Sequence, residues 1–290
     1  MLQGFVRPEA LVSTQWLDER LADPDLRIYD CTVHLPPDPP RIYKVVGGRP
    51  GYDAGHVPGA DFLDLQFELS DPEAGLDFML ASPARFAEAM SRRGLGPRQT
   101  AVLYAQASPM WATRAWWMLR AMGFDRACVL DGGLTKWKAE GRMLSTEPAR
   151  YPPTRFEARP RVGAMADRSA VQAAVGDPEV RILSARSREL FEGTTYDYGR
   201  RGRIPGSVNV PAGSLVDETQ AYLPAERLRA AFAAVDVVPG RRVIAYCGAG
   251  IAATSDAFAL HLLGHDDVAV YDGSMSDWSS DPSLPMETGR

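Results

Sequence analysis

The sequence contains the same series of short motifs twice, in the same order. Four motif pairs carry this repeat: residues 23–30 and 177–184, 55–60 and 202–207, 102–104 and 243–246, and 129–133 and 270–274. Because the order is repeated as well as the motifs, an internal duplication explains them better than chance does. The chain is therefore expected to fold as two similar units.

Each unit has the pattern of an α/β fold, in which short apolar runs alternate with helical patterns. In the second unit, strands are expected at residues 180–183, 207–210, 242–247 and 268–271. Helices are expected at residues 169–175, 225–234 and 252–263, the last of them ended by Gly264. Such alternation is typical of a mainly parallel sheet with helices on both faces.

The boundary between the units is expected in a proline-rich stretch near the middle of the chain. Prolines occur there at positions 148, 152, 153 and 160 among few apolar residues, as in a linker. The length of 290 residues also favours two domains. We predict a first domain at residues 9–145, a linker at 146–163 and a second domain at 164–290.

Composition and charge argue against several classes of protein. A net charge of −5 and an isoelectric point near 5.5 speak against nucleic acid as the main partner. No stretch is apolar enough to span a bilayer, and the N-terminal residues lack the apolar core of a signal peptide, so a cytoplasmic protein is expected. Three scattered cysteines are too few for a disulfide framework or a zinc site. Gly264 separates His261 from His265, so surface or helix-cap roles are expected for these histidines rather than a metal site.

Cys247 carries the strongest chemical signal in the chain. It directly follows the apolar run 243–245 and precedes an amphipathic helical stretch, with Gly248 and Gly250 close behind it. Backbone N–H groups converge at such a turn, and together with the helix dipole they favour an anion, here the reactive thiolate. A buried structural thiol is the alternative, but a packed cysteine does not need two nearby glycines. Cys247 is therefore predicted to be a nucleophile.

These motifs together resemble the rhodanese family over residues 9 to 290, and most closely its tandem-domain sulfurtransferases that use thiosulfate or 3-mercaptopyruvate. The resemblance rests on the paired segments at 55–60 and 202–207, the cysteine loop, and Tyr-Asp-Gly-Ser at 271–274. It implies two rhodanese-like domains, a silent first and a catalytic second, with the substrate cleft between them. It also implies an active loop that cradles a persulfide without metal or organic cofactor, formed here by Cys247, Gly248, Ala249, Gly250, Ile251 and Ala252.

The implied reaction is sulfur transfer in two half-reactions. The Cys247 thiolate attacks the outer sulfur of a small anionic donor, releases sulfite or pyruvate, and becomes a persulfide. Cyanide or a thiol then accepts the sulfur, and a thioredoxin-like or other thiol protein is a candidate acceptor in cells. The loop N–H groups are expected to stabilise the negative terminal sulfur, and ping-pong kinetics should follow.

The first unit provides an internal comparison for the active loop. Aligning the repeats places Ala105 or Gln106 opposite Cys247, and neither is a nucleophile. Pro109 also removes an N–H group that an anion cradle would use. The first domain is therefore expected to be catalytically silent.

Arginines are the candidates for holding the donor, because an anion in a partly dry cleft needs a cationic partner. The resemblance implies an arginine where this chain has Leu190. The candidates to replace it are Arg200, Arg201 and Arg203, with a solvated basic loop as the alternative. Arg186 is a further candidate, although an internal pair with a carboxylate such as Asp272 is expected instead.

His56 and Ala249 bear on the choice of donor. His56 matches a histidine that the resemblance associates with a proton relay, and a backbone hydrogen bond at its Val-Pro-Gly turn is the alternative. The uncharged Gly248 and Ala249 resemble the mercaptopyruvate type, yet Ala249 stands where that type often has a serine. The thiolate is therefore expected to be maintained by the loop and the helix end alone, and the donor stays open.

Two other functions compete with this interpretation. A phosphatase with a C-x5-R loop would need arginine at Ala253, and without it the phosphate charge loses its main support. A sulfur-relay carrier, loaded by the persulfide of another protein, is compatible with the same loop. Steady turnover of small donors would favour the enzyme over the carrier.

Overall fold

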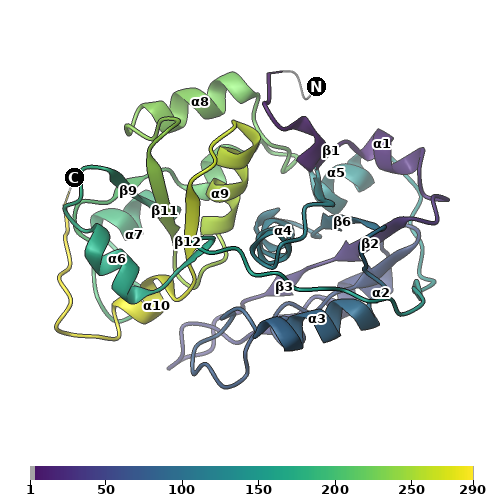
Figure 1. Ribbon diagram of the computed structural model, residues 1–290, viewed down its shortest axis with the longest axis horizontal. Coiled ribbons are helices and arrows are strands. Elements are labelled where there is room, and N and C mark those ends of the chain that lie inside the picture. Colours follow the sequence, from purple (N-terminus) through teal and green to yellow (C-terminus); the bar gives the residue numbers. More distant parts are fainter. Residues whose placement is uncertain (1–3, 290) are drawn as a thin grey trace.

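The computed structural model describes residues 4–289 and contains two five-stranded parallel sheets, one in each half of the chain (Figure 1). The first sheet has the order β1 (Leu11–Val12), β7 (Ala127–Leu130), β6 (Thr100–Tyr104), β2 (Leu26–Asp30) and β5 (Ala60–Phe62). The second has the order β10 (Val208–Asn209), β9 (Val180–Ser184), β11 (Arg242–Tyr246), β12 (Val268–Tyr271) and β8 (Met165–Ala166). A small antiparallel pair, β3 (Val33–His34) and β4 (Val46–Gly47), follows β2.

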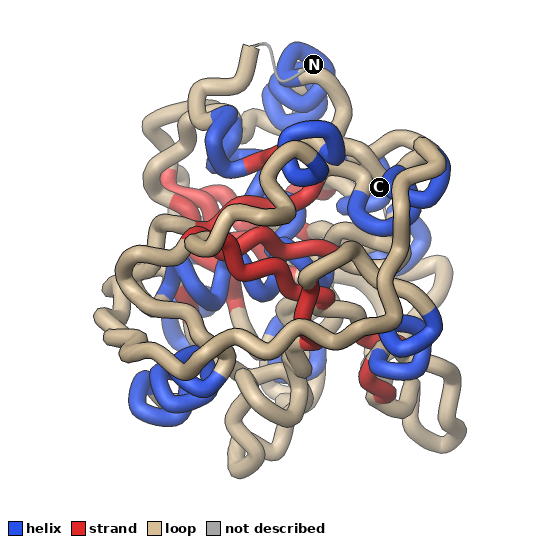
Figure 2. Tube along the Cα trace, turned by 90° about the vertical axis from the view of Figure 1, so that its right-hand side faces the viewer, coloured by secondary structure: helices blue, strands red, loops and turns tan. Residues whose placement is uncertain are grey.

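Helices cover both faces of each sheet, and in Figure 2 the strands run through the middle of the molecule with helices around them. The outward faces are covered by α1 (Thr14–Asp18), α2 (Arg49–Ala54), α5 (Gly133–Ala139), α6 (Arg168–Ala174) and α10 (Ser274–Trp278). The faces toward the other domain are covered by α3 (Pro83–Arg92), α4 (Met110–Ala121), α8 (Ala225–Ala233) and α9 (Ala253–Leu262). Three short helices complete the chain: η1 (Pro8–Ala10), α7 (Arg188–Glu192) and η2 (Ala212–Leu215).

The two domains share one apolar core, which runs from one sheet to the other through α4 and α9. Trp116 of α4 meets Phe258 of α9 edge to face, with ring centroids 4.8 Å apart. Both side chains are buried, as the aromatic-rich sequence of α4 suggests. Because this core is continuous, the first domain is positioned firmly against the helix that follows Cys247.

The internal repeat appears in the structure as equivalent hydrogen bonds. Tyr104 pairs with Asp30 in the first sheet, as Tyr246 pairs with Ser184 in the second. The hydroxyl oxygen of each tyrosine accepts a backbone N–H from the matching turn, at 3.3 Å from Val57 or from Ile204. The predicted fold class is thus confirmed, and the residue after each tyrosine occupies the same place in both domains.

The predicted elements agree closely with the observed ones in the second domain. The strand expected at 268–271 has those bounds, and the helix expected at 252–263 is observed as α9, one residue shorter at each end. Residues 146–163, predicted as a linker, contain no helix or strand. Among residues 4–289 we find no helix with the length and apolar character needed to cross a membrane.

Candidate active site

Cys247 lies between the end of β11 and the start of α9, at the carboxyl edge of the second sheet. Its side chain is a free thiol that is only 3% exposed. Parallel strands present their carboxyl ends at one edge, and this edge is where α/β folds bind ligands. The six residues 247–252 form the whole connection between strand and helix.

Ser274 fixes the shape of this loop from the neighbouring strand end. Its Oγ accepts the N–H of Cys247 at 3.0 Å and that of Gly250 at 3.1 Å, and donates to the carbonyl of Tyr271 at 2.7 Å. Ser274 has a φ of +48°, a conformation that costs a non-glycine residue about 1–2 kcal/mol. The three hydrogen bonds offset that strain, so the serine acts as a rigid anchor for the loop.

The remaining N–H groups of the loop have no partner of their own. Within residues 4–289, no hydrogen bond is formed by the backbone N–H groups of Gly248, Ala249, Ile251 and Ala252. Buried donors that lack a partner are costly, and a bound anion removes that cost. The loop is thus built to hold negative charge beside Cys247.

Gly250 is required by the turn that closes the loop. Its φ is +73°, and a Cβ at this position would lie 2.4 Å from the carbonyl oxygen of Asp272. Any side chain would therefore strain the backbone and push it away from the β12 end. Gly250 therefore allows the loop to pass close to the backbone of Asp272.

Two tyrosines, one from each domain, lie close to Cys247. A Cβ on Gly248 would lie 2.9 Å from the hydroxyl of Tyr198, so this phenol covers the loop directly. Burial raises the pKa of Tyr198, and the neighbouring Tyr43 and Cys247 raise it further. The pKa of Tyr43 is also raised, mainly by burial. Both phenols stay protonated and keep a hydroxyl hydrogen for donation.

The first domain also contacts the active loop through Arg114 of α4. Its fully buried guanidinium donates to the carbonyl of Gly250 at 3.1 Å and pairs with Asp272 at 2.7 Å. The second carboxylate oxygen of Asp272 accepts the N–H of Leu80 at 2.7 Å. The loop is therefore held by the domain that lacks the nucleophile.

Arg186 forms an internal ion pair, as expected, but its partner is not Asp272. Arg186 is buried and pairs with Asp197, and it donates to the carbonyl of Gly202 at 3.0 Å. Asp272 pairs instead with Arg114 of the first domain. Arg186 thus holds the 197–202 segment, which carries Tyr198 over the loop. Its contact with a donor stays a prediction.

The other candidate arginines are tied to the protein backbone. Arg200 donates to the carbonyls of Asp281 and Leu284, at 2.9 and 2.8 Å. Arg201 is exposed and donates to two carbonyls of the same loop, with its guanidinium over the ring of Tyr196. These contacts orient the loop, and a donor contact by either arginine stays a prediction.

Arg203 and His56 occupy equivalent turns of the two domains. The backbone of Arg203 pairs with Glu287, and that of His56 with Ser145, so each turn fastens the end of its own domain. The Arg203 guanidinium also contacts Glu287, and both ring nitrogens of the buried His56 face carbonyl oxygens, at 2.8 and 3.0 Å. These contacts account for both residues structurally, and their catalytic roles stay predictions.

The equivalent loop of the first domain has no thiol and is filled by its own side chain. Ala105 is the counterpart of Cys247, since its carbonyl accepts the N–H of Leu134 as that of Cys247 accepts the N–H of Met275. The side chain of Gln106 donates to Asp30 at 3.0 Å and to the carbonyl of Gly48 at 3.1 Å. Its amide oxygen lies against α2, since a Cβ on Gly51 would be 2.0 Å from it.

Four residues near the loop were not identified from the sequence as site residues: Tyr43, Arg114, Tyr198 and Ser274. Arg114 could have been noticed in the sequence because it is the one charged residue between the tryptophans 111 and 116. No comparable signal in the sequence indicates Tyr43, because this residue comes from a loop of the other domain.

Comparison with known proteins assigns the family. The model of the rhodanese-like domain matches residues 13–140 and again residues 167–281. The chain therefore belongs to the rhodanese family and carries two copies of its domain.

Three relatives match over nearly the whole of this chain and of their own length. A probable 3-mercaptopyruvate sulfurtransferase of Pseudomonas aeruginosa is 35% identical, over 96% of this chain and 98% of that protein. A sulfur carrier protein of Thermus thermophilus is 32% identical over 99% of each. The crystal structure of the Escherichia coli 3-mercaptopyruvate sulfotransferase matches with a TM-score of 0.81 and 32% identity, covering 91% of this chain and 98% of that one.

Proposed function

We propose that this protein is a sulfurtransferase that moves sulfane sulfur from thiosulfate or 3-mercaptopyruvate to a thiol or cyanide through a persulfide on Cys247. The observation that carries the proposal is the buried free thiol in a loop with four N–H groups that lack partners among residues 4–289. The names of the relatives support the same activity. No resident cofactor is needed for either half-reaction.

Each half-reaction exchanges one bond to sulfur for another. The Cys247 thiolate attacks the outer sulfur of the donor, a new S–S bond forms, and the bond from that sulfur to the rest of the donor breaks. Its electron pair leaves with sulfite, or with the pyruvate enolate, which then takes up a proton. An acceptor thiolate or cyanide next attacks the outer persulfide sulfur, and the electrons of the S–S bond return to Cys247.

The loop amides and the two tyrosines are proposed to hold the donor. The terminal sulfur would lie against the free N–H groups, which stabilise its charge without a change in the protein. The hydroxyls of Tyr43 and Tyr198 would face the anionic remainder of the donor, and the buried Arg186 pairs with Asp197, the residue next to Tyr198. This places the substrate between a first domain at residues 9–145 and a second at 164–290.

Thiocyanate formation from each donor in the presence of cyanide tests the proposal. Cys247→Ser should abolish it, and incubation with donor should add the mass of one sulfur to the Cys247 peptide of the wild-type protein. Tyr198→Phe should raise the Michaelis constant of the donor severalfold, whereas Tyr196→Phe, at an exposed tyrosine of the same loop, serves as the matched control. Activity that survives in Cys247→Ser would contradict the mechanism.

A sulfur-relay carrier remains the second candidate because one full-length relative is named as a sulfur carrier protein. A carrier would be loaded by the persulfide of a protein partner and would show no steady turnover with small donors. In both cases a thioredoxin-like or other thiol protein of the cytoplasm is the proposed acceptor. Loading by a protein persulfide alone would decide for the carrier.

A further inference from the structure

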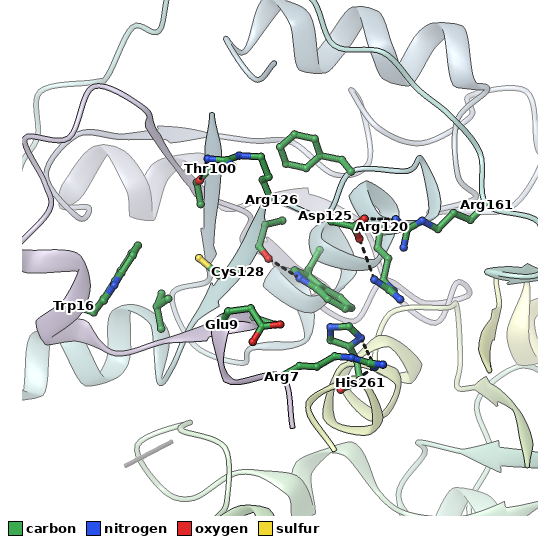
Figure 3. Close-up of a pocket in the computed structure, with 15 residues that line it drawn as sticks. Arg7, Glu9, Trp16, Thr100, Arg120, Asp125, Arg126, Cys128, Arg161 and His261 are labelled. Carbon is green, nitrogen blue, oxygen red and sulfur yellow. Dashed lines mark hydrogen bonds and ion pairs between the residues drawn. The ribbon is translucent and has the colours of Figure 1, made fainter. Parts of the chain in front are cut away.

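A hollow of about 530 Å³ lies at the opposite end of α9 from Cys247. It is bordered by the N-terminal segment, the start of β6, the stretch from α4 to β7, the linker and the end of α9, so five separate parts of the chain build it (Figure 3). The proposed sulfur chemistry uses none of these residues. The hollow therefore calls for an explanation of its own.

One side of the hollow is crowded with guanidinium groups. Arg120 and Arg161 share a single carboxylate, Asp125, which lies between them in Figure 3. Arg7 approaches the same side and pairs with the exposed Asp266. The two partly buried arginines thus have one carboxylate between them, and Arg126, which also lines the hollow, bonds only to Gln99 and Thr100 within residues 4–289.

His261 reports the same excess of positive charge. The sequence suggested a surface or cap role, but the residue is buried, 9% exposed, with its ring beside Trp116. Burial first, and then Arg120, Arg7 and Arg161, lower the pKa of His261 to about 3 against the opposing effect of Asp266. Burial, with Arg161 next, also lowers the pKa of Arg120. His265, for which a surface or cap role was likewise expected, is buried too.

The remaining walls are mostly apolar. They include Val12, Trp16, Phe124, Ala127 and Cys128. The exposed Glu9 lines the same hollow, and its carboxylate points into it in Figure 3. A ligand that suits both sides must combine an anionic group with an apolar body.

We propose that this hollow binds a small organic anion, whose oxyanion group pairs with Arg120 and Arg161 and whose flat apolar body packs against the Trp16 side. Phosphates and carboxylates share the required chemistry, because a guanidinium binds either in a bidentate fashion. Asp125 orients both guanidiniums, and the volume accommodates an aromatic or heterocyclic ring with its anionic substituent. Glu9 opposes the ligand charge and limits its affinity.

Calorimetric titration with phenyl phosphate at low salt tests the site. Arg120→Gln or Arg161→Gln should weaken binding about tenfold, as expected for loss of a charge-assisted hydrogen bond. Glu9→Gln should strengthen binding. Arg159→Gln is the matched control, because Arg159 lies exposed on the same linker and does not line the hollow. Thiocyanate turnover at the wild-type rate verifies that each variant is folded.

Three further ligands separate the contribution of the anionic group to binding from that of the apolar body. Benzoate replaces phosphate by carboxylate, inorganic phosphate lacks the apolar body, and benzyl alcohol lacks the charge. Phenyl phosphate or benzoate should bind more tightly than both of the last two. The proposal is overturned if Arg120→Gln and Arg161→Gln bind phenyl phosphate like the wild type, if inorganic phosphate binds equally well, or if millimolar phenyl phosphate does not bind.

Discussion

At the scale of single residues, the active loop depends on a strained serine. Ser274 holds two loop N–H groups and occupies a backbone conformation that suits glycine, which is the residue found at the equivalent position 133 of the first domain. The strain and the anchor thus occur together in the catalytic copy and are both absent from the other. The serine keeps the loop in shape at a local energetic cost.

Replacing Ser274 should separate loop geometry from overall stability. Ser274→Gly removes the anchor but also relieves the φ strain, so the free energy of unfolding should change by less than about 1 kcal/mol. Ser274→Ala keeps the strain and should be less stable than Ser274→Gly. Both variants should lose turnover, measured as thiocyanate formation, because the loop N–H groups are no longer fixed. Wild-type turnover in Ser274→Gly would show that the anchor is dispensable.

At the scale of elements, helix α9 carries a buried carboxyl group, that of Asp256, which lacks hydrogen-bond partners among residues 4–289. Asp256 is fully buried, and neither of its side-chain oxygens has a hydrogen-bond partner within residues 4–289. Burial raises the pKa of Asp256 well above its usual value. The folded protein therefore keeps a proton that the unfolded chain releases once the pH exceeds about 4.

This difference should make stability fall as the pH rises. Above about pH 4 the unfolded chain binds fewer protons than the folded one, so Asp256 costs up to about 1.4 kcal/mol per pH unit until its folded pKa is reached. Urea unfolding between pH 5 and 8 should show a flatter dependence for Asp256→Asn than for the wild type. Glu88→Gln, an exposed change on α3, should leave the slope unaltered. Parallel slopes for Asp256→Asn and the wild type would contradict this account.

The sequence predicted elements well where the apolar pattern is regular, and site contacts poorly where they cross between domains. Strand β12 follows from its short apolar run, and the end of helix α9 from its terminal glycine. The amphipathic pattern predicted for α9 was wrong, because all of its residues are buried in the core that the two domains share. The predicted pairing of Arg186 with Asp272 was wrong. Arg186 pairs with Asp197, and Asp272 pairs with Arg114, which lies far away in the chain. Likewise, nothing local in the sequence indicates that Tyr43 approaches Cys247. Periodicity reports burial, whereas these contacts depend on how the two domains dock.

At the scale of the whole molecule, the first domain takes part in building the candidate site. Arg114 reaches across the shared core to the carbonyl of Gly250 and to Asp272, and all of these groups are buried. A guanidinium removed from such a place leaves a carboxylate without its partner. The catalytic domain is thus incomplete without its neighbour.

Arg114→Met should therefore damage both stability and catalysis. Loss of one member of a buried ion pair typically costs about 3–5 kcal/mol, and the unpaired Asp272 should also disturb Gly250. Arg92→Met, which breaks an exposed pair on α3, should cost less than about 1 kcal/mol and leave turnover intact. Thermal unfolding and the turnover number of the remaining folded protein give the two readouts. Equal behaviour of the two variants would argue against a role for the first domain in shaping the loop.

The filled loop of the first domain also limits how the chain can change by mutation. A cysteine introduced at position 105 would be followed by Gln106, whose side chain is held by Asp30 and Gly48, where the second domain has Gly248. Gly51 of α2 leaves room for that amide, since a Cβ there would lie 2.0 Å from its oxygen. A cysteine at position 105 alone would therefore not reproduce the Cys247 loop. On the proposed mechanism, damage to Cys247 finds no substitute in the equivalent loop of the first domain.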